Sequence, residues 1–145
     1  MSKILTADLI PVLQIAIGPV ILISGVGLLL LTMTNRLGRA IDRARLLASY
    51  TKKDRKEIED QISILWSRAR ILRFAIQLVA ASALCSSFLI VSLFFTVLFK
   101  IELAWLISTL FIGSMVFLVG ALILFLRDIN KSLAALVIEI KPHRK

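Results

Sequence analysis

A chain of 145 residues with a formal net charge of +9 and 59% hydrophobic residues is long enough for one domain, yet it is too apolar for an ordinary soluble one. Soluble proteins contain about 45–50% apolar residues, and their surface helices keep a polar stripe toward water. The composition therefore excludes a soluble globular domain and predicts a single integral membrane domain over residues 1–145.

Three runs of the sequence contain no Asp, Glu, Lys, Arg or His: Leu9–Asn35, Phe74–Phe99 and Leu103–Leu126. Each run exceeds the roughly 20 residues that an α-helix needs to cross about 30 Å of hydrocarbon. Membrane-spanning β-strands would be shorter and would alternate in polarity, which excludes a barrel. We expect an all-α fold, a three-helix transmembrane bundle with spans at residues 9–35, 74–99 and 103–126.

The basic residues are unevenly distributed around these runs, and their distribution predicts an orientation. Sixteen of the eighteen Lys and Arg residues lie either between the first two runs or after the third, the exceptions being Lys3 and Lys100. Lys and Arg near the ends of spanning helices are retained on the cytoplasmic side. We therefore expect a multi-pass protein of the bacterial inner (cytoplasmic) membrane, with the N-terminus outside and the C-terminus in the cytoplasm.

The segment between the first two runs keeps a helical pattern. Apolar residues recur with a period of about 3.5 in both of its halves. They are Leu37, Ile41, Ala44 and Ala48 in the first half, and Ile58, Ile62, Leu65, Ala69 and Leu72 in the second. This pattern predicts a cytoplasmic helical hairpin at residues 36–73 that extends the first two spans, and residues 127–141 similarly predict a cytoplasmic C-terminal helix.

Small residues and a Gly-Pro pair interrupt the bulky side chains of the spans. Gly18-Pro19 predicts a helix kink, because proline removes a helical hydrogen bond and crowds the preceding turn. Small residues let helices approach closely in a membrane. The positions expected at helix contacts are Gly25, Gly27, Ser82, Ser86, Gly113 and Gly120. The kink is consistent with a hinge or a pore lining, but plain helix packing is the favoured interpretation, because Gly and Pro are common in spanning helices.

Five arginines flank the first two spans on the side assigned to the cytoplasm: Arg36, Arg39, Arg43, Arg70 and Arg73. One interpretation is contact with anionic lipid headgroups, which attract basic residues close to the membrane surface. The other is a ring of guanidinium groups at the mouth of a pore, where they would select anions or bind a phosphorylated ligand.

A family resemblance rests on two motifs. The motif Thr34-Asn35-Arg36-Leu37-Gly38-Arg39-Ala40-Ile41-Asp42-Arg43-Ala44-Arg45 follows a first span containing Gly-Pro. The motif Arg68-Ala69-Arg70-Ile71-Leu72-Arg73 precedes a span rich in small residues. With these motifs the chain, from about Ile4 to Leu136, resembles a bacterial inner-membrane family known only as a domain of unknown function. The resemblance implies three spans and no known substrate, cofactor or catalytic residue.

The spans lack the residues that chemistry requires. Serine nucleophiles need a neighbouring base, and none lies within an apolar run, so we expect no catalytic residue and no enzyme activity. Cys85 and His143 lie far apart in the expected topology, so we expect no metal and no cofactor. The positive charge is accounted for by topology, and we expect no nucleic-acid partner.

Two functional hypotheses remain. The first is a non-enzymatic membrane protein that forms a homo-oligomer through its slim helix faces, with or without a passive channel whose cytoplasmic mouth is basic. The second is an accessory or scaffold subunit whose cytoplasmic helical hairpin binds a protein partner, while its basic surface contacts anionic membrane lipid.

Overall fold

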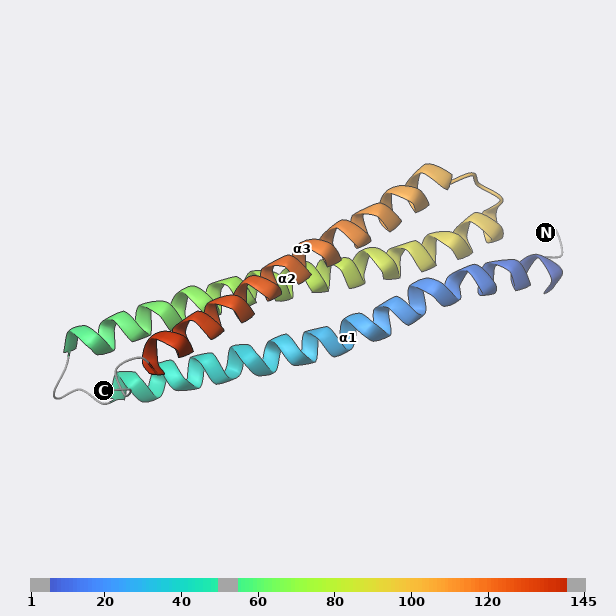
Figure 1. The fold of residues 1–145 in the computed structure, drawn as a ribbon. Helices are drawn as coiled ribbons and strands as arrows, with labels where there is room; N and C mark the ends of the chain where they lie inside the picture. Colours follow the sequence, from blue (N-terminus) through green and yellow to red (C-terminus); the bar gives the residue numbers. More distant parts are fainter. Residues whose placement is uncertain (1–5, 50–54, 141–145) are drawn as a thin grey trace. The chain divides into compact units, whose positions relative to one another are not determined.

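The computed structural model of the protein describes residues 6–49 and 55–140, with the side chains of residues 9–49 and 61–132. Three long helices follow one another along the chain (Figure 1): α1 is Thr6–Ser49, α2 is Arg55–Phe99 and α3 is Ala104–Ile140. The predicted all-α fold with three helices is confirmed. Residues 50–54, in the middle of the predicted hairpin at residues 36–73, and residue 141, the end of the predicted C-terminal helix, lie outside the described residues.

Each helix continues through the charged residue at which its predicted span ends. Helix α1 runs unbroken past Arg36, α2 begins well before Phe74, and α3 extends beyond Arg127. No proline lies at these boundaries, and charged residues with long side chains are good helix formers. Pro11 and Pro19 both lie inside α1.

The chain forms two compact units, each built from segments of all three helices. Unit 1 comprises Met1–Leu30 and Leu78–Val119, and unit 2 comprises Leu31–Gln77 and Gly120–Lys145.

A small polar cluster lies at the contact between α2 and α3 in unit 1. Ser82, Ser86 and Ser114 are buried. The Ser82 hydroxyl donates to the Ser114 carbonyl at 2.9 Å, and the Ser114 hydroxyl donates to the Ser82 carbonyl at 3.2 Å. The Ser86 and Ser114 hydroxyls are 2.7 Å apart. Since each hydroxyl has one proton, Ser86 must be the donor to Ser114 in this arrangement.

The buried residues of unit 2 come from all three helices. Met33 and Ala40 belong to α1, Leu72 and Ala75 to α2, and Ala121 to α3. Small residues on each helix allow the helices to approach closely around the larger side chains of Met33 and Leu72, which have no exposed surface.

A short connection joins α2 to α3 in unit 1. Lys100, directly after α2, has a φ of 54°, the left-handed conformation in which many helices end. The Leu103 carbonyl accepts a 3.0 Å hydrogen bond from the Ile107 amide and so starts α3. Just before the connection, the rings of Phe95 and Phe99 stack with centroids 5.3 Å apart.

Many large apolar side chains of the described helices are exposed. Ile21 and Leu28 of α1, Leu84 of α2 and Ile112 of α3 each have 60% or more of their surface accessible. Three helices contain windows of mean hydropathy 2.3 to 2.6 and are long enough to cross a membrane. Apolar side chains at such density are stable only in contact with lipid or another apolar surface. Length and composition therefore class the chain as a multi-pass membrane protein.

We expect Ser114→Ala to lower the free energy of unfolding by about 1 kcal/mol, because hydrogen bonds between membrane helices contribute about that much. Unfolding by sodium dodecyl sulfate in mixed micelles measures the change. Ser108→Ala is the matched control, since the exposed Ser108 hydroxyl bonds only to the Ala104 carbonyl of its own helix. Equal stability of the two variants would show that the serine cluster does not hold α2 to α3.

Candidate functional site

One charged side chain is buried within the described part of the chain, and it is Asp128 of α3. Its carboxylate has no exposed surface. Two guanidinium groups bind it from the other helices: Arg36 Nη1 of α1 lies 3.3 Å from Oδ2, and Arg68 Nε of α2 lies 3.3 Å from Oδ1. The three residues thus join all three helices of unit 2 at one point.

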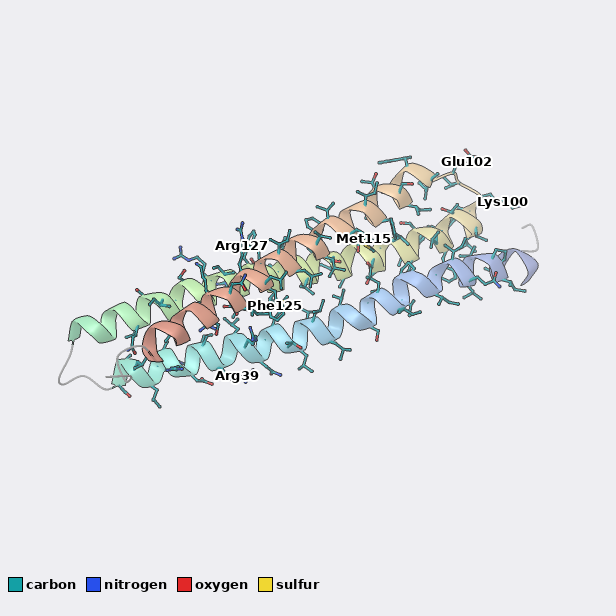
Figure 2. The ribbon with its side chains drawn as sticks, viewed as in Figure 1. Arg39, Lys100, Glu102, Met115, Phe125 and Arg127 are labelled. Atoms are coloured by element: carbon teal, nitrogen blue, oxygen red, sulfur yellow. The ribbon has the colours of Figure 1, made fainter. Side chains whose placement is uncertain are left out.

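The arginines of this carboxylate–guanidinium cluster, Arg36, Arg68 and Asp128, remain partly accessible. The side chains of Arg36 and Arg68 are 32% and 20% exposed, respectively. Arg36 also lies over the ring of Phe125, with 5.4 Å between its guanidinium carbon and the ring centroid, which adds a cation–π contact. Phe125 lies on α3 in the same part of unit 2 as Arg39 of α1 (Figure 2). Two positive charges on one negative charge leave the cluster with a net charge of +1.

Asp128 and Arg68 were not among the expected site residues. The predicted third span ended at Leu126, so Asp128 fell in the predicted cytoplasmic C-terminal helix at residues 127–141. A sequence signal for its burial exists, because Asp128 follows Ala121 by seven residues and Ser114 by fourteen. A period of seven keeps residues on one helix face, and both of the earlier residues are buried. Continuing that period past Arg127 would have placed Asp128 inside.

The other expected arginines are placed differently from Arg36. Arg39 and Arg43 are exposed on α1, and Arg70 and Arg73 are exposed on α2. Arg70 and Arg73 line a groove, whereas Arg36 binds Asp128. The five arginines therefore have three locations. Arg36 belongs to an internal cluster, Arg70 and Arg73 line a groove, and Arg39 and Arg43 are exposed on α1 outside the groove.

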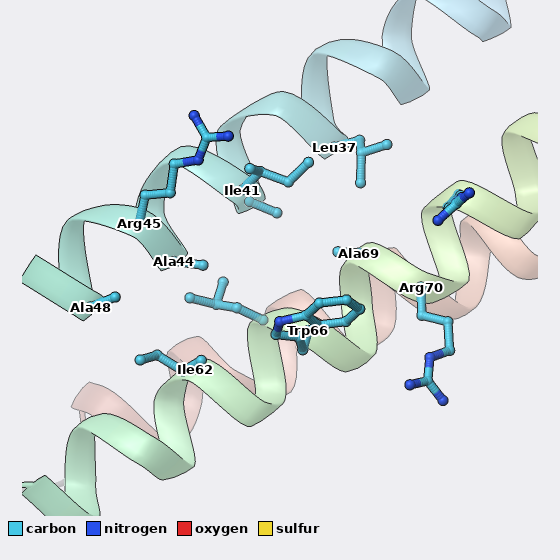
Figure 3. A pocket seen from close by; sticks show the side chains of 12 residues that line it. Leu37, Ile41, Ala44, Arg45, Ala48, Ile62, Trp66, Ala69 and Arg70 are labelled. Carbon is cyan, nitrogen blue, oxygen red and sulfur yellow. The ribbon is translucent and has the colours of Figure 1, made fainter.

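The groove has a volume of about 510 Å³ and lies between α1 and α2 of unit 2 (Figure 3). Its floor is apolar, and the exposed indole of Trp66 lies across it. Arg45 and Arg70 stand at its edges. The residues that line it are Leu37, Ala40, Ile41, Ala44, Arg45 and Ala48 of α1, and Ile62, Leu65, Trp66, Ala69, Arg70 and Arg73 of α2.

Three of the glycines expected at helix contacts, Gly25, Gly27 and Gly113, have no atom within 4 Å of the position that a Cβ would take. The same holds for Gly18 of the predicted kink. Gly120 is half-buried. In contrast, Ser82 and Ser86 are buried at the contact of α2 with α3. Gly18, Gly25 and Gly27 of α1 therefore make no close helix contact with the part of the chain that the structure describes.

Among residues 9–49 and 61–132, no three side chains of His, Cys, Asp or Glu gather as metal ligands would. Within those same ranges Asp128 has no acidic neighbour to share a metal ion, and both of its oxygens already accept hydrogen bonds from arginine. The cluster is therefore suited to joining helices by charge-assisted hydrogen bonds.

Fold and site together define a multi-pass α-helical membrane protein whose helices meet at a buried carboxylate. The family DUF2721, described as proteins of unknown function, matches residues 16–138. This chain belongs to that family, and the expected membership of an uncharacterised family is confirmed. Searches of the curated proteins and of the solved structures found no match.

We expect Asp128→Asn to lower the free energy of unfolding by about 2 kcal/mol, because it leaves two guanidinium groups without their counter-ion. Removing one partner of a fully buried ion pair costs about 3–5 kcal/mol, and the partial exposure of Arg36 and Arg68 keeps the loss here below that range. Unfolding in mixed micelles measures it, and Asp42→Asn, at an exposed carboxylate of α1, is the control.

Removing all three charges at once should recover much of this loss, since apolar side chains often replace a buried ion pair without cost. The test variant combines Asp128→Leu, Arg36→Met and Arg68→Met. If Asp128→Asn is no less stable than Asp42→Asn, the cluster does not stabilise unit 2.

Proposed function

We propose that this is a non-enzymatic protein of the bacterial inner membrane that works as a homo-oligomer, with its N-terminus outside and its C-terminus in the cytoplasm. The observation that carries self-association is an uncovered face of α1 in unit 1, formed by Gln14, Gly18, Ile21, Gly25 and Leu28. We call it the outer face of α1.

The outer face has the spacing of a helix-packing seam. Its members follow one another at intervals of four, three, four and three residues, the period of two helices that wind around each other. All five are exposed, while the buried residues Val12, Ala16 and Val26 lie toward the other side of α1. Two opposite sides of α1 thus have residues at helix-packing positions, but only the side with Val12, Ala16 and Val26 is buried within this chain.

Two features of the outer face favour a protein neighbour over lipid. Gly18 and Gly25 leave room for another helix backbone, and the dispersion attraction between closely packed backbones is a main driving force for the association of membrane helices. Gln14 brings an exposed amide into an apolar run, where lipid offers no hydrogen-bond partner. A second copy of α1 would supply both the close surface and a second amide.

The orientation is supported by the distribution of basic residues, because sixteen of eighteen lie on the side proposed to be cytoplasmic. The exposed residues Arg39 and Arg43 then lie close to the end of the first apolar run, within reach of anionic lipid headgroups.

A passive pore is the finer form of this proposal. In an assembly around α1, Arg39, Arg43, Arg70 and Arg73 would surround the cytoplasmic mouth. Arg36 would act from its fixed position on Asp128, since its guanidinium group is already bound. Vesicles that contain the reconstituted protein and show no ion flux across a salt gradient would remove the pore and leave the assembly standing.

Thiol labelling in intact cells tests the orientation. In a Cys85→Ser background, we expect Glu102→Cys, in the exposed connection between α2 and α3, to react with a membrane-impermeant maleimide added outside. Asp42→Cys, exposed on α1, should react only after the cells are opened. Labelling of Asp42→Cys in intact cells would reverse the orientation.

Self-association is tested by Gly25→Leu, which places a bulky side chain at the centre of the outer face. We expect at least a tenfold weaker association, because the backbones can no longer approach closely. Energy transfer between labelled copies in liposomes, followed as lipid is added, measures it. Gly27→Leu is the matched control, since Gly27 is equally open but points to another side of α1.

Equal effects of the two leucine variants would show that the outer face is not the contact. A wild-type protein that remains a monomer both in mild detergent and in nanodiscs would contradict self-association itself.

A further inference from the structure

We propose that the groove between α1 and α2 of unit 2 is a docking site for an amphipathic helix with acidic side chains, supplied by a different protein. This interaction is separate from the self-association proposed for the outer face of α1. It involves residues 37–48 of α1 and residues 62–73 of α2, which are the two arms of the groove.

The shape of the groove suits a helix. Ala40, Ala44 and Ala48 follow one another at intervals of four residues on one arm and lie along one side of α1. Such a row of methyl groups leaves a channel in which another helix can approach closely. At a rise of 1.5 Å per residue, each arm is about 16 Å long, which matches about three turns of a docked helix.

The floor of the groove is an apolar surface without a partner within the described residues. Ile41 points toward α2, and Ile62 and Ala69 lie across from it, yet the two arms leave space between them (Figure 3). The indole of Trp66 is 64% exposed in this space. Exposed apolar grooves with an aromatic side chain commonly receive the apolar face of a partner helix.

The positive charge at the rim of the groove indicates which side chains lie beside the apolar face of the partner helix. Arg45, Arg70 and Arg73 line the groove and are exposed. None of the three is paired with an acidic side chain within residues 9–49 and 61–132. Carboxylates on either side of the apolar face of a docked helix would meet these guanidinium groups.

The same charge argues against a second copy of this chain as the occupant. The stretch from Arg36 to Arg73 contains eleven basic and five acidic residues, so two such arms would bring like charges together. A lipid acyl chain is also disfavoured. The groove-lining residues follow the first apolar run and precede the second. The acyl chain of a lipid would therefore have to leave the hydrocarbon of the bilayer to reach the groove floor.

The experiment uses the full chain in nanodiscs of phosphatidylcholine, with Trp105→Phe so that Trp66 is the one remaining indole. The probe is a synthetic helix of about 14 residues, or four turns, with Leu on one face and Glu beside it. A second peptide carries Lys in place of every Glu. We expect a saturable shift of Trp66 emission to shorter wavelength with the Glu peptide, and at least tenfold weaker binding of the Lys peptide.

Charge reversal at the rim identifies the site. Arg45→Glu combined with Arg70→Glu should weaken the Glu peptide at least tenfold and strengthen the Lys peptide. Arg39→Glu, exposed on α1 outside the groove, should change either affinity less than twofold. Ala44→Phe, which fills the floor, should weaken the Glu peptide at least tenfold, as measured by the anisotropy of a labelled peptide. The unfolding midpoint of each variant checks that it is folded.

Four results would overturn the proposal. The Glu and Lys peptides could bind equally well, or Arg39→Glu could weaken binding as much as the rim variant. Nanodiscs containing phosphatidylglycerol could shift Trp66 emission and exclude the Glu peptide, which would make anionic lipid the occupant. Finally, Trp66 emission could depend on the protein concentration alone, which would make a second copy the occupant.

Discussion

A carboxylate without access to water, held by guanidinium groups from two other helices, is the constraint on which the arrangement of unit 2 depends. Burying Asp128 is costly unless both oxygens are satisfied, and Arg36 and Arg68 satisfy one oxygen each. Neither arginine can bond to it unless α1 and α2 present the correct residue at the correct height beside α3. Apolar packing alone would tolerate a helix displaced by a turn. The cluster does not, and it therefore specifies how the three helices align.

The serine cluster of unit 1 has the corresponding role between α2 and α3. On α2, Ser82 follows Arg68 of the charged cluster by fourteen residues, which is two heptads. On α3, Ser114 precedes Asp128 by the same number. Arg68 and Ser82 therefore lie at equivalent heptad positions of α2, and Ser114 and Asp128 at equivalent heptad positions of α3. In unit 1 the contact is made by hydroxyl groups, whose protons are donated to backbone carbonyls of the neighbouring helix. Such carbonyls are present on every helix, so these hydrogen bonds need no further polar side chain. Charged groups serve in unit 2, where the arginines keep part of their surface accessible.

The three helices could be predicted from the sequence because their apolar runs exceed the length of a membrane span and contain no proline besides Pro11, in the first turn of its run, and Pro19. The apolar stripe of each hairpin arm could also be predicted from its 3.5-residue period. The role of Asp128 was missed because the end of the third span was placed at the first charged residue, although a helix keeps its inward face beyond that point. The separate roles of Arg36 and Arg39 could not be predicted either. They depend on whether another helix presents a carboxylate, and spacing within one helix does not contain that information.

The net charge of the chain thus combines arginines with two different roles. Arg36 and Arg68 neutralise an internal carboxylate, and their charge stabilises the contact of α1 and α2 with α3. Arg45, Arg70 and Arg73 face outward around an apolar floor. The internal cluster lies next to the groove in the sequence. Ala69 of the groove floor directly follows Arg68, and Ala40 of the floor follows Arg36 by one helical turn. The internal cluster therefore holds the two arms of the groove in place without a partner. The helix proposed as the occupant of the groove would meet a surface already organised, and less of its binding free energy would be lost to ordering the arms.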